Sequence, residues 1–282
     1  MYFKEKLEEK LEEKIKRITS LLGGDINDTY KIHTSDNVYA LKVNRRDAFP
    51  EMFQKEKLGL ESISKTGTKA PDVILTFSDS EYQFLLLEFI EESPVDPSFW
   101  KNFADDLVKI HQSFSNDFGL EYDNYIGSLH QDNTQKPSWE NFFIENRLMP
   151  LVKSGYDDNL LHVKHLIHFE NFYKKVNEII PQEKPSLLHG DLWGGNLMKG
   201  KNNTPVFIDP AIYYGHREVD ISMTQMFGGF DNSYLTFYNH SFPLEKGWEE
   251  RIKIHNLYPN LVHLNLFGLG YLSGIEMVIK DF

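Results

Sequence analysis

The sequence predicts an α+β protein with two unlike lobes, a small N-terminal one over residues 1–90 and a larger one over 91–282. Two observations support this prediction. The first part of the chain holds short segments that alternate apolar and polar residues between turn residues, as in an antiparallel sheet. After the segment Glu91–Asp96, apolar residues recur at helical spacing instead. We therefore expect a five-stranded antiparallel sheet with one helix, followed by a mostly helical lobe.

The small lobe is expected to begin with a surface helix over 2–16, because Leu7, Leu11 and Ile15 recur near helical spacing. Three strands follow, separated by turns at Gly23-Gly24 and at Ser35-Asp36-Asn37. One more helix and two more strands complete the lobe, over 47–65, 72–77 and 82–90.

The large lobe is expected to consist mainly of helices, over 97–115, 138–153, 158–180, 217–228, 245–257 and 260–279. The stretch Ser186–Ala211 interrupts them with short apolar runs. The two lobes join at Glu88–Pro94. A cleft between unlike lobes is a usual place for a small-molecule site.

Composition excludes several classes of function. The chain of 282 residues has no cysteine, which rules out disulfides, a thiolate nucleophile and a cysteine-based zinc site. A net charge of −12 argues against a nucleic-acid partner and is compatible with a cationic substrate. The charged N-terminus is not a signal peptide, and no apolar run has the length of a membrane span. We expect a cytoplasmic protein; its oligomeric state stays open.

The stretch Ser186–Ala211 places two acids and an amide beside apolar segments, namely Asp191, Asn196 and Asp209. Burying a carboxylate is costly unless it is paired, so these residues indicate chemistry rather than packing. Phosphoryl transfer needs a base for the attacking hydroxyl and oxygen ligands for Mg²⁺. We expect Asp191 to act on the hydroxyl and Asn196 and Asp209 to bind Mg²⁺.

The small lobe offers groups that suit the phosphates of ATP. Lys42 lies in an alternating strand, and Glu56 follows 14 residues later on the next helix, where it can hold the lysine against the α- and β-phosphates. The turn between the first two strands is suited to cover phosphates with backbone N–H groups. The nucleotide-binding set expected is Gly23, Gly24, Asp25, Ile26, Asn27, Lys42, Glu56 and, at the join of the lobes, Glu88 and Ile90.

The sequence resembles the fructosamine kinase (ketosamine-3-kinase) family, within the larger group of aminoglycoside-phosphotransferase-like and choline-kinase-like enzymes. The resemblance extends over almost the whole chain. The matching segments are Gly23–Asn27, ALKVN at 40–44, HGDLWGGN at 189–196, IDPA at 208–211, GHREVDISMTQMFGGF at 215–230 and HLNLFGLGYL at 263–272.

The resemblance implies a protein-kinase-like fold and ATP-dependent phosphorylation of a sugar hydroxyl on a ketosamine, either free or bound to protein. The product releases its amine, which implies a role in deglycation repair. The resemblance also implies that Trp193 and His263 help to form the sugar pocket and that Asp220 and Arg217 are structural, with Asp220 bracing the catalytic loop. Some family members are redox-regulated through a cysteine in the glycine loop; this chain has Asp25 there, which excludes that regulation.

Two alternatives remain open at this stage. One is another kinase of the same fold, acting on an aminoglycoside, choline, homoserine or a thiosugar. The other is a nucleotide-binding module without activity, against which the intact set of Lys42, Asp191, Asn196 and Asp209 argues.

Overall fold

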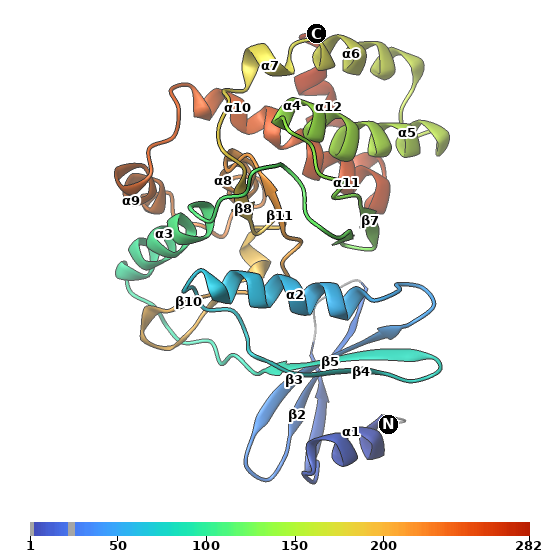
Figure 1. The fold of residues 1–282 in the computed structure, drawn as a ribbon, viewed down its shortest axis with the longest axis vertical. Helices are drawn as coiled ribbons and strands as arrows, with labels where there is room; N and C mark the ends of the chain where they lie inside the picture. Colours follow the sequence, from blue (N-terminus) through green and yellow to red (C-terminus); the bar gives the residue numbers. More distant parts are fainter. Residues whose placement is uncertain (1–2, 22–25) are drawn as a thin grey trace.

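A five-stranded antiparallel sheet forms one end of the molecule and a group of helices forms the other (Figure 1). The computed structural model describes residues 3–21 and 26–282. The strand order is β1-β2-β3-β5-β4. The strands are β1 Arg17–Ser20, β2 Asp28–His33, β3 Val38–Arg45, β4 Val73–Ser78 and β5 Tyr82–Glu88. The predicted α+β class, with its small N-terminal sheet, is confirmed.

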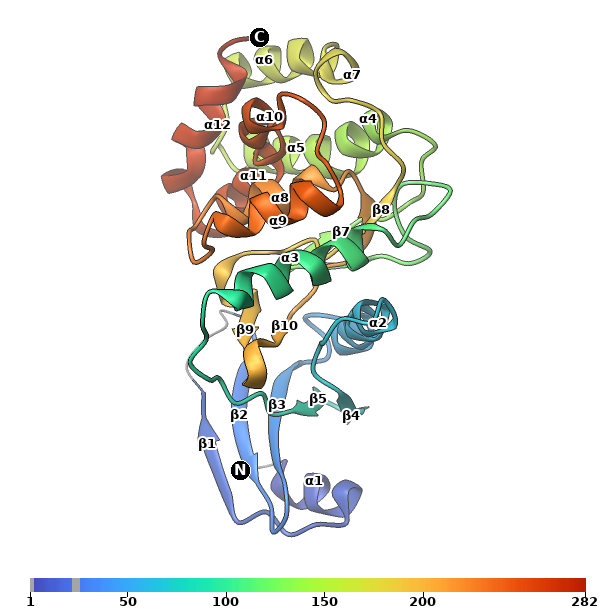
Figure 2. The ribbon, with the colours of Figure 1, turned by 90° about the vertical axis from the view of Figure 1, so that its left-hand side faces the viewer.

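The sheet buries side chains on both faces, because successive residues of a strand point in opposite directions. On β3, Leu41 and Val43 belong to a core that also includes Phe3 and Leu7, at the start of the helix α1 (Lys4–Leu11). The other face of β3 carries Lys42 and lies toward the helix α2 (Met52–Lys65). In Figures 1 and 2, α2 lies between the sheet and the helical part of the molecule.

The helical part begins with α3 (Ser98–His111) and ends with α12 (Leu272–Ile279). A π-helical turn over Phe143–Leu148 joins α4 to α5. The remaining helices are α4 Trp139–Phe142, α5 Met149–Asp157, α6 Val163–Tyr173, α7 Val176–Ile179, α8 Glu218–Thr224, α9 Ser233–Ser241, α10 Trp248–His255 and α11 Leu257–Phe267.

Three short antiparallel pairs of strands lie among these helices. The strand β8 (Ser186–Leu188) pairs with β11 (Tyr213–Gly215), and β9 (Leu197–Lys199) pairs with β10 (Pro205–Phe207). The third pair is formed by β6 Asn124–Ile126 and β7 Leu129–Gln131. Figure 2 shows β9 and β10 between α3 and the sheet. The predicted functional stretch therefore folds into small strands that reach toward the N-terminal sheet.

The predicted element boundaries differ from the structure at several points. The first helix ends at Leu11, because Glu12 adopts a left-handed backbone with φ 56°. The segment 158–180 holds two helices, since α6 ends at Tyr173. Gly268, with φ 86°, separates α11 from α12 within the segment predicted as one helix over 260–279. The strands β6 and β7 and the helix α9 were not predicted.

None of the helices in the described parts of the chain combines the length and the apolar character that crossing a membrane requires.

Candidate active site

The loop between β8 and β9 holds the sequence His189-Gly190-Asp191, and its path depends on Gly190. This glycine has φ 82°, and a Cβ at its position would lie 2.1 Å from the carbonyl oxygen of Ala211. No other residue fits such a close approach of two backbones without displacing one of them. Gly190 thus brings the loop beside the segment that follows Asp209.

Asp220 of α8 stabilises this loop through hydrogen bonds to its backbone. Its carboxylate accepts hydrogen bonds from the backbone N–H groups of His189 (2.7 Å) and Gly190 (3.0 Å). The Nε2 of His111, on α3, lies 3.2 Å from the same carboxylate. Asp220 is 1% exposed, so its buried charge is compensated by these donors. The bracing role predicted for Asp220 is therefore present in the geometry.

Asp191 is half-buried and has Asn196 as its nearest polar partner. The amide Nδ2 of Asn196 donates to the backbone oxygen (2.8 Å) and to the carboxylate Oδ2 (2.9 Å) of Asp191. Burial raises the pKa of Asp191 to about 7, and the negative charges of Asp209 and Asp220 add to it, while the hydrogen bond from Asn196 opposes the rise. A carboxyl group with such a pKa can exchange a proton near neutral pH.

Lys42 forms two ion pairs, one within the N-terminal part of the chain and one with the segment after β10. Its Nζ lies 2.6 Å from Oε1 of Glu56, on α2, and 2.5 Å from Oδ1 of Asp209. Burial alone would lower the pKa of Lys42, but the charges of Asp209 and Glu56 outweigh it and raise the pKa. Asp209 has a left-handed backbone with φ 54°, which residues other than glycine adopt rarely.

These side chains line one pocket between the sheet and the helical part, with a volume of about 410 Å³. Lys42, Glu56, Asp191, Asn196 and Asp209 all border it. Ile26 and Asn27 border it as well, and Oδ1 of Asn27 accepts a hydrogen bond from Asn44 at 2.7 Å. Gly23, Gly24 and Asp25, which were predicted to cover phosphates, lie outside the described residues.

Glu88 and Ile90 line a different pocket of about 520 Å³, where the end of β5 faces β10. Val38 and Val206 border the same pocket. Val38 is on the same strand as Lys42, and Val206 is on the strand that precedes Asp209, so the two pockets adjoin. The carboxylate of Glu88 accepts from Nζ of Lys69 at 2.5 Å. The side chain of Glu88 is thus paired, and its backbone N–H donates to the backbone oxygen of Asp72 at 2.9 Å.

A third pocket, of about 990 Å³, opens on the other side of Asp191. Trp193 and His263, both predicted as substrate residues, line it together with Asp191. Trp193 is 41% exposed, and Nδ1 of His263 lies 2.7 Å from the backbone oxygen of Pro259. Burial lowers the pKa of His263, which favours its neutral form at pH 7. The structure thus brings the two residues to one pocket, although 70 positions separate them in the sequence.

Other residues of this site were missed in the sequence. Phe227, Phe267 and Tyr271 line the large pocket. A signal for two of them was available, because His263, Phe267 and Tyr271 recur every four residues, as on one helix face. Asn124 of β6 also borders the smaller pocket and donates to the backbone oxygen of Ile212 at 2.9 Å, which supports the segment after Asp209. No pattern in the sequence indicates that role.

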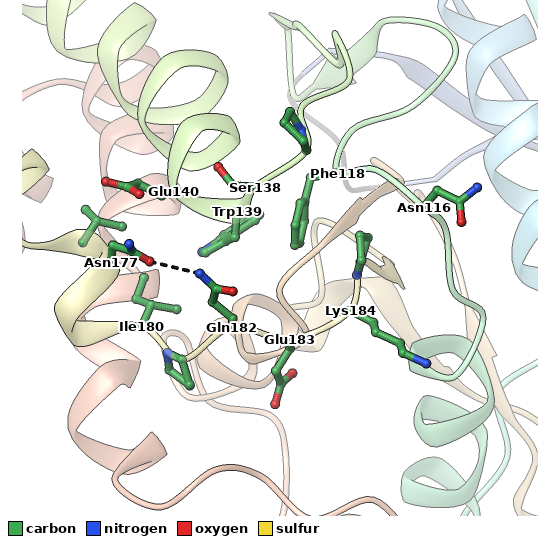
Figure 3. Close-up of a pocket in the computed structure, with 14 residues that line it drawn as sticks. Asn116, Phe118, Ser138, Trp139, Glu140, Asn177, Ile180, Gln182, Glu183 and Lys184 are labelled. Atoms are coloured by element: carbon green, nitrogen blue, oxygen red, sulfur yellow. Dashed lines mark hydrogen bonds between the residues drawn. The ribbon is translucent and has the colours of Figure 1, made fainter.

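Figure 3 shows a further pocket, of about 380 Å³, that contains none of the predicted site residues. Apolar groups such as Phe118 and Ile180 line it, and the Trp139 indole contributes a buried N–H without a partner among the described residues. Two acids line it: Glu183 is paired with Arg217 at 2.8 Å, and Glu140 lies in the first turn of α4. The pocket shares no lining residue with the two pockets that Asp191 borders.

One buried cluster has the composition of a metal site, namely His216, Glu218 and His255. Both carboxylate oxygens of Glu218, however, accept hydrogen bonds from the guanidinium of Arg251, at 2.8 and 2.5 Å. Burial lowers the pKa of His216 to about 4, so it is neutral at pH 7. A cation already neutralises the only acid of this cluster, and the cluster fits a structural role.

The chain matches a protein family along its whole length. The fructosamine kinase family model matches residues 2–282. A protein from Enterococcus faecium named as a ketoamine kinase is 37% identical over 270 residues, which cover 94% of this chain and 95% of that protein. The chloroplastic protein-ribulosamine 3-kinase of Arabidopsis thaliana is 34% identical, over 98% of this chain and 85% of that protein.

Solved structures agree with this assignment. A fructosamine-3-kinase structure from Thermobifida fusca superposes with a TM-score of 0.89 at 29% identity, over 98% of this chain and 96% of that one. An aminoglycoside phosphotransferase superposes with a TM-score of 0.67 at 13% identity, over 99% and 98% of the two chains, which supports the fold alone. The predicted protein-kinase-like fold is confirmed, and the chain belongs to the fructosamine kinase family.

Proposed function

We propose that this protein transfers the γ-phosphoryl group of ATP to a sugar hydroxyl of a ketosamine. The observation that carries the proposal is the position of Asp191, which borders both the 410 Å³ pocket of Lys42 and the 990 Å³ pocket of Trp193. A phosphoryl donor in the first pocket and an acceptor in the second would meet at this carboxylate. Relatives named as ketoamine kinase and protein-ribulosamine 3-kinase support the choice of acceptor.

Asp191 is the proposed base. Its Oδ2 is held by Asn196, which orients the carboxylate at the boundary of the two pockets. The attacking sugar hydroxyl would donate its proton to Asp191 as the bond to phosphorus forms. With a pKa raised to about 7 by burial, the carboxylate can take this proton and return it to solvent near neutral pH.

Lys42 is the proposed cation for the α- and β-phosphates. Its two ion pairs, with Glu56 and Asp209, keep it charged and aimed into the nucleotide pocket. Glu88 and Ile90 border the adjoining 520 Å³ pocket and are proposed to contact the base of ATP. Gly23, Gly24, Asp25, Ile26 and Asn27 are proposed to cover the phosphates.

Asn196 and Asp209 fit a Mg²⁺ ion by their donor chemistry. Asn196 uses its Nδ2 on Asp191, so its amide oxygen is the group left to bind a metal, and Lys42 contacts only Oδ1 of Asp209. An amide and a carboxylate oxygen are ligands that Mg²⁺ accepts, with phosphate oxygens and water filling the shell. When bound, the ion would neutralise charge on the phosphates.

The large pocket favours a ketosamine over a polycationic aminoglycoside. Among the described residues that line it, Asp191 is the only acid. A ligand with several ammonium groups would need several carboxylates to compensate their desolvation. A ketosamine carries its sugar on a single amine and therefore does not require several carboxylates in the pocket. Release of that amine after phosphorylation would amount to deglycation of the acceptor. The cytoplasmic location and the absence of a nucleic-acid partner remain predictions from the sequence.

The proposal is tested by measuring ADP formation with ATP, Mg²⁺ and a panel of acceptors. We expect turnover with ribulosamine or fructosamine adducts of lysine, whether free or in a glycated protein, and much slower turnover with the free ketoses. An aminoglycoside, choline, homoserine and a thiosugar serve as competing acceptors. Preferential turnover of any of these would contradict the ketosamine assignment. The Asp191→Asn variant is the control for background ATP hydrolysis.

A further inference from the structure

The pocket beside Asp191 is larger than a sugar requires. Its volume of about 990 Å³ lies at the upper end of the range for small-molecule sites, which is about 300–1,000 Å³. A hydroxyl that reacts at Asp191 fixes one end of the acceptor. The rest of the pocket is therefore available to whatever is attached to the sugar.

A chain of aromatic rings leads away from Asp191 along this pocket. The rings of Trp193 and Phe227 meet edge to face with centroids 6.3 Å apart. Phe227 then contacts His263 at 5.0 Å, and His263 contacts Tyr271 at 4.8 Å and Phe267 at 5.5 Å. We call Phe227, Phe267 and Tyr271 the outer aromatic wall.

The outer aromatic wall is open to solvent. Phe227 is 42% exposed and Phe267 is 52% exposed. Large aromatic side chains that remain exposed side by side mark a ligand groove more often than a packing defect. Their surface is available to an acceptor that enters the pocket.

The segment that carries Phe227 is docked on the catalytic loop. A Cβ at Gly194 would lie 3.0 Å from the backbone oxygen of Gly228 and 3.3 Å from Cα of Gly229. A Cβ at Gly195 would lie 2.3 Å from the ring of Trp193, so the indole lies directly on this glycine. Both rings are therefore placed relative to Asp191 by backbone contacts rather than by flexible side chains.

The electrostatics of the pocket suit a single cation on an aromatic surface. The secondary amine of a ketosamine is protonated near neutral pH. Of the described lining residues, only Asp191 is acidic, and burial favours the neutral form of His263. Beyond Asp191, the groups that can receive a positive charge are the ring faces, through cation–π contacts.

We propose that the outer aromatic wall is a subsite for the amine-linked arm of the acceptor. The sugar lies at Asp191 and Trp193, and the ammonium group and the chain attached to it lie against Phe227, Phe267 and Tyr271. The inference rests on the proposed function and adds to it a reason for accepting amines that carry long side chains, such as lysine.

The test compares two acceptors with the same sugar and different arms. One is the ribulosamine of Nα-acetyl-lysine amide, and the other is the ribulosamine of methylamine, which is too short to reach far along the outer aromatic wall. Both acceptors carry the same ammonium group, so the ratio of their kcat/KM values measures the contact of the long chain with the outer aromatic wall. In Phe267→Ala and in Phe227→Ala we expect the ratio for the long arm over the short arm to fall about 3- to 30-fold, because the methylene groups of the chain lose apolar contact. This ratio does not depend on the fraction of enzyme that is folded.

The matched control is Phe237→Ala on α9, which removes a phenylalanine that is 36% exposed and lies outside the pocket. It should leave the ratio as in the wild type. An unchanged ratio in both wall variants would overturn the inference while leaving the proposed function intact. A wild-type protein that phosphorylates neither acceptor would overturn the proposed function, and the inference with it.

Discussion

Lys42 on β3 and Asp209 after β10 form an ion pair with 2.5 Å between Nζ and Oδ1. Lys42, which is proposed to bind the phosphates of ATP, thus contacts Asp209, which is proposed to bind Mg²⁺. The pair also connects the N-terminal sheet to the helical part across the nucleotide pocket. Entry of Mg·ATP would exchange this contact for two others, of Lys42 with phosphate and of Asp209 with the metal.

Replacing Lys42 with methionine should lower kcat/KM for ATP by about 10²–10³-fold, because it removes a preorganised positive charge from the phosphates. Steady-state rates at varied ATP measure the effect. Lys57→Met, on the same helix as Glu56 and paired with Glu61 at 3.8 Å, is the control and should keep wild-type rates. Wild-type ATP kinetics in Lys42→Met would show that the lysine has no part in the reaction.

Asp191→Asn should reduce kcat by about 10²–10⁴-fold, since the amide cannot accept the proton from the acceptor hydroxyl. In the wild type, kcat/KM for the acceptor should rise with pH and level off above a midpoint near 7, because only the ionised carboxylate is a base and its pKa is raised to about 7. Nucleotide affinity, measured by calorimetry, should survive the substitution. A flat pH profile between 5.5 and 8.5 would contradict the assignment of the base.

Asp191 should also make the free energy of unfolding depend on pH. Because burial raises its pKa from 3.8 to about 7, the stabilising contribution of the protonated form is complete below pH 4 and is lost as the pH rises through 7. Asp191→Asn does not titrate, so relative to the wild type it should gain about 2–3 kcal/mol, or about 5–10 °C in Tm, between pH 5 and pH 8. Thermal unfolding at the two pH values measures this gain, and an equal Tm difference at both would refute it.

Asp220→Ala should cost about 1–3 kcal/mol of stability, since it leaves the buried N–H groups of His189 and Gly190 without their acceptor. The catalytic loop loses its support, so kcat should fall more than the affinity for ATP. Asp220→Asn keeps one acceptor oxygen and should recover part of both losses. Asp158→Ala, which removes an exposed acid at the end of α5, is the control. Equal kcat in all three variants would show that the loop holds its shape without Asp220.

Asp209→Asn should raise the Mg²⁺ concentration that gives half-maximal activity by about 10- to 100-fold. The amide retains the size of the side chain and loses its charge. Titration of activity with Mg²⁺ at saturating ATP measures the change, and Asp105→Asn on α3, an exposed acid paired with Lys101, is the matched control. An unchanged titration curve would remove Asp209 from the metal site.

Much of the fold could be predicted from periodicity, because the strands of the sheet bury alternate residues and leave a clear pattern. The strand β3 was predicted with Lys42 on it, and α2 with Glu56 on it, since both elements are long and regular. The short pairs of strands in the helical part were harder to predict. Each of β6 and β7 has three residues, and their stability comes from hydrogen bonds such as that of Asn124 with Ile212, which local sequence does not reveal.

The candidate site was predicted best where chemistry and spacing coincide. Asp191 and Asn196 lie five positions apart in one loop, so their proximity follows from the sequence. Net charge was a weaker guide to the site, because it is a property of the whole surface, whereas the large pocket has one acid, Asp191, among its described lining residues. Phe227 was missed because a single exposed aromatic residue has no pattern of its own, whereas Phe267 lies four residues after His263, a spacing that could have indicated it.

The two pockets that meet at Asp191 share the lining residues Ile26, Gly127, Asp191 and Trp193 and differ in the rest. Lys42 and Glu56 border the nucleotide pocket, whereas Phe227, Phe267 and Tyr271 border the acceptor pocket and not the nucleotide pocket. Substitutions in the second group can therefore accumulate without altering the handling of phosphate. Such a division allows the range of acceptors to diverge between lineages, or to be changed by directed evolution, while the phosphoryl-transfer machinery is inherited unchanged.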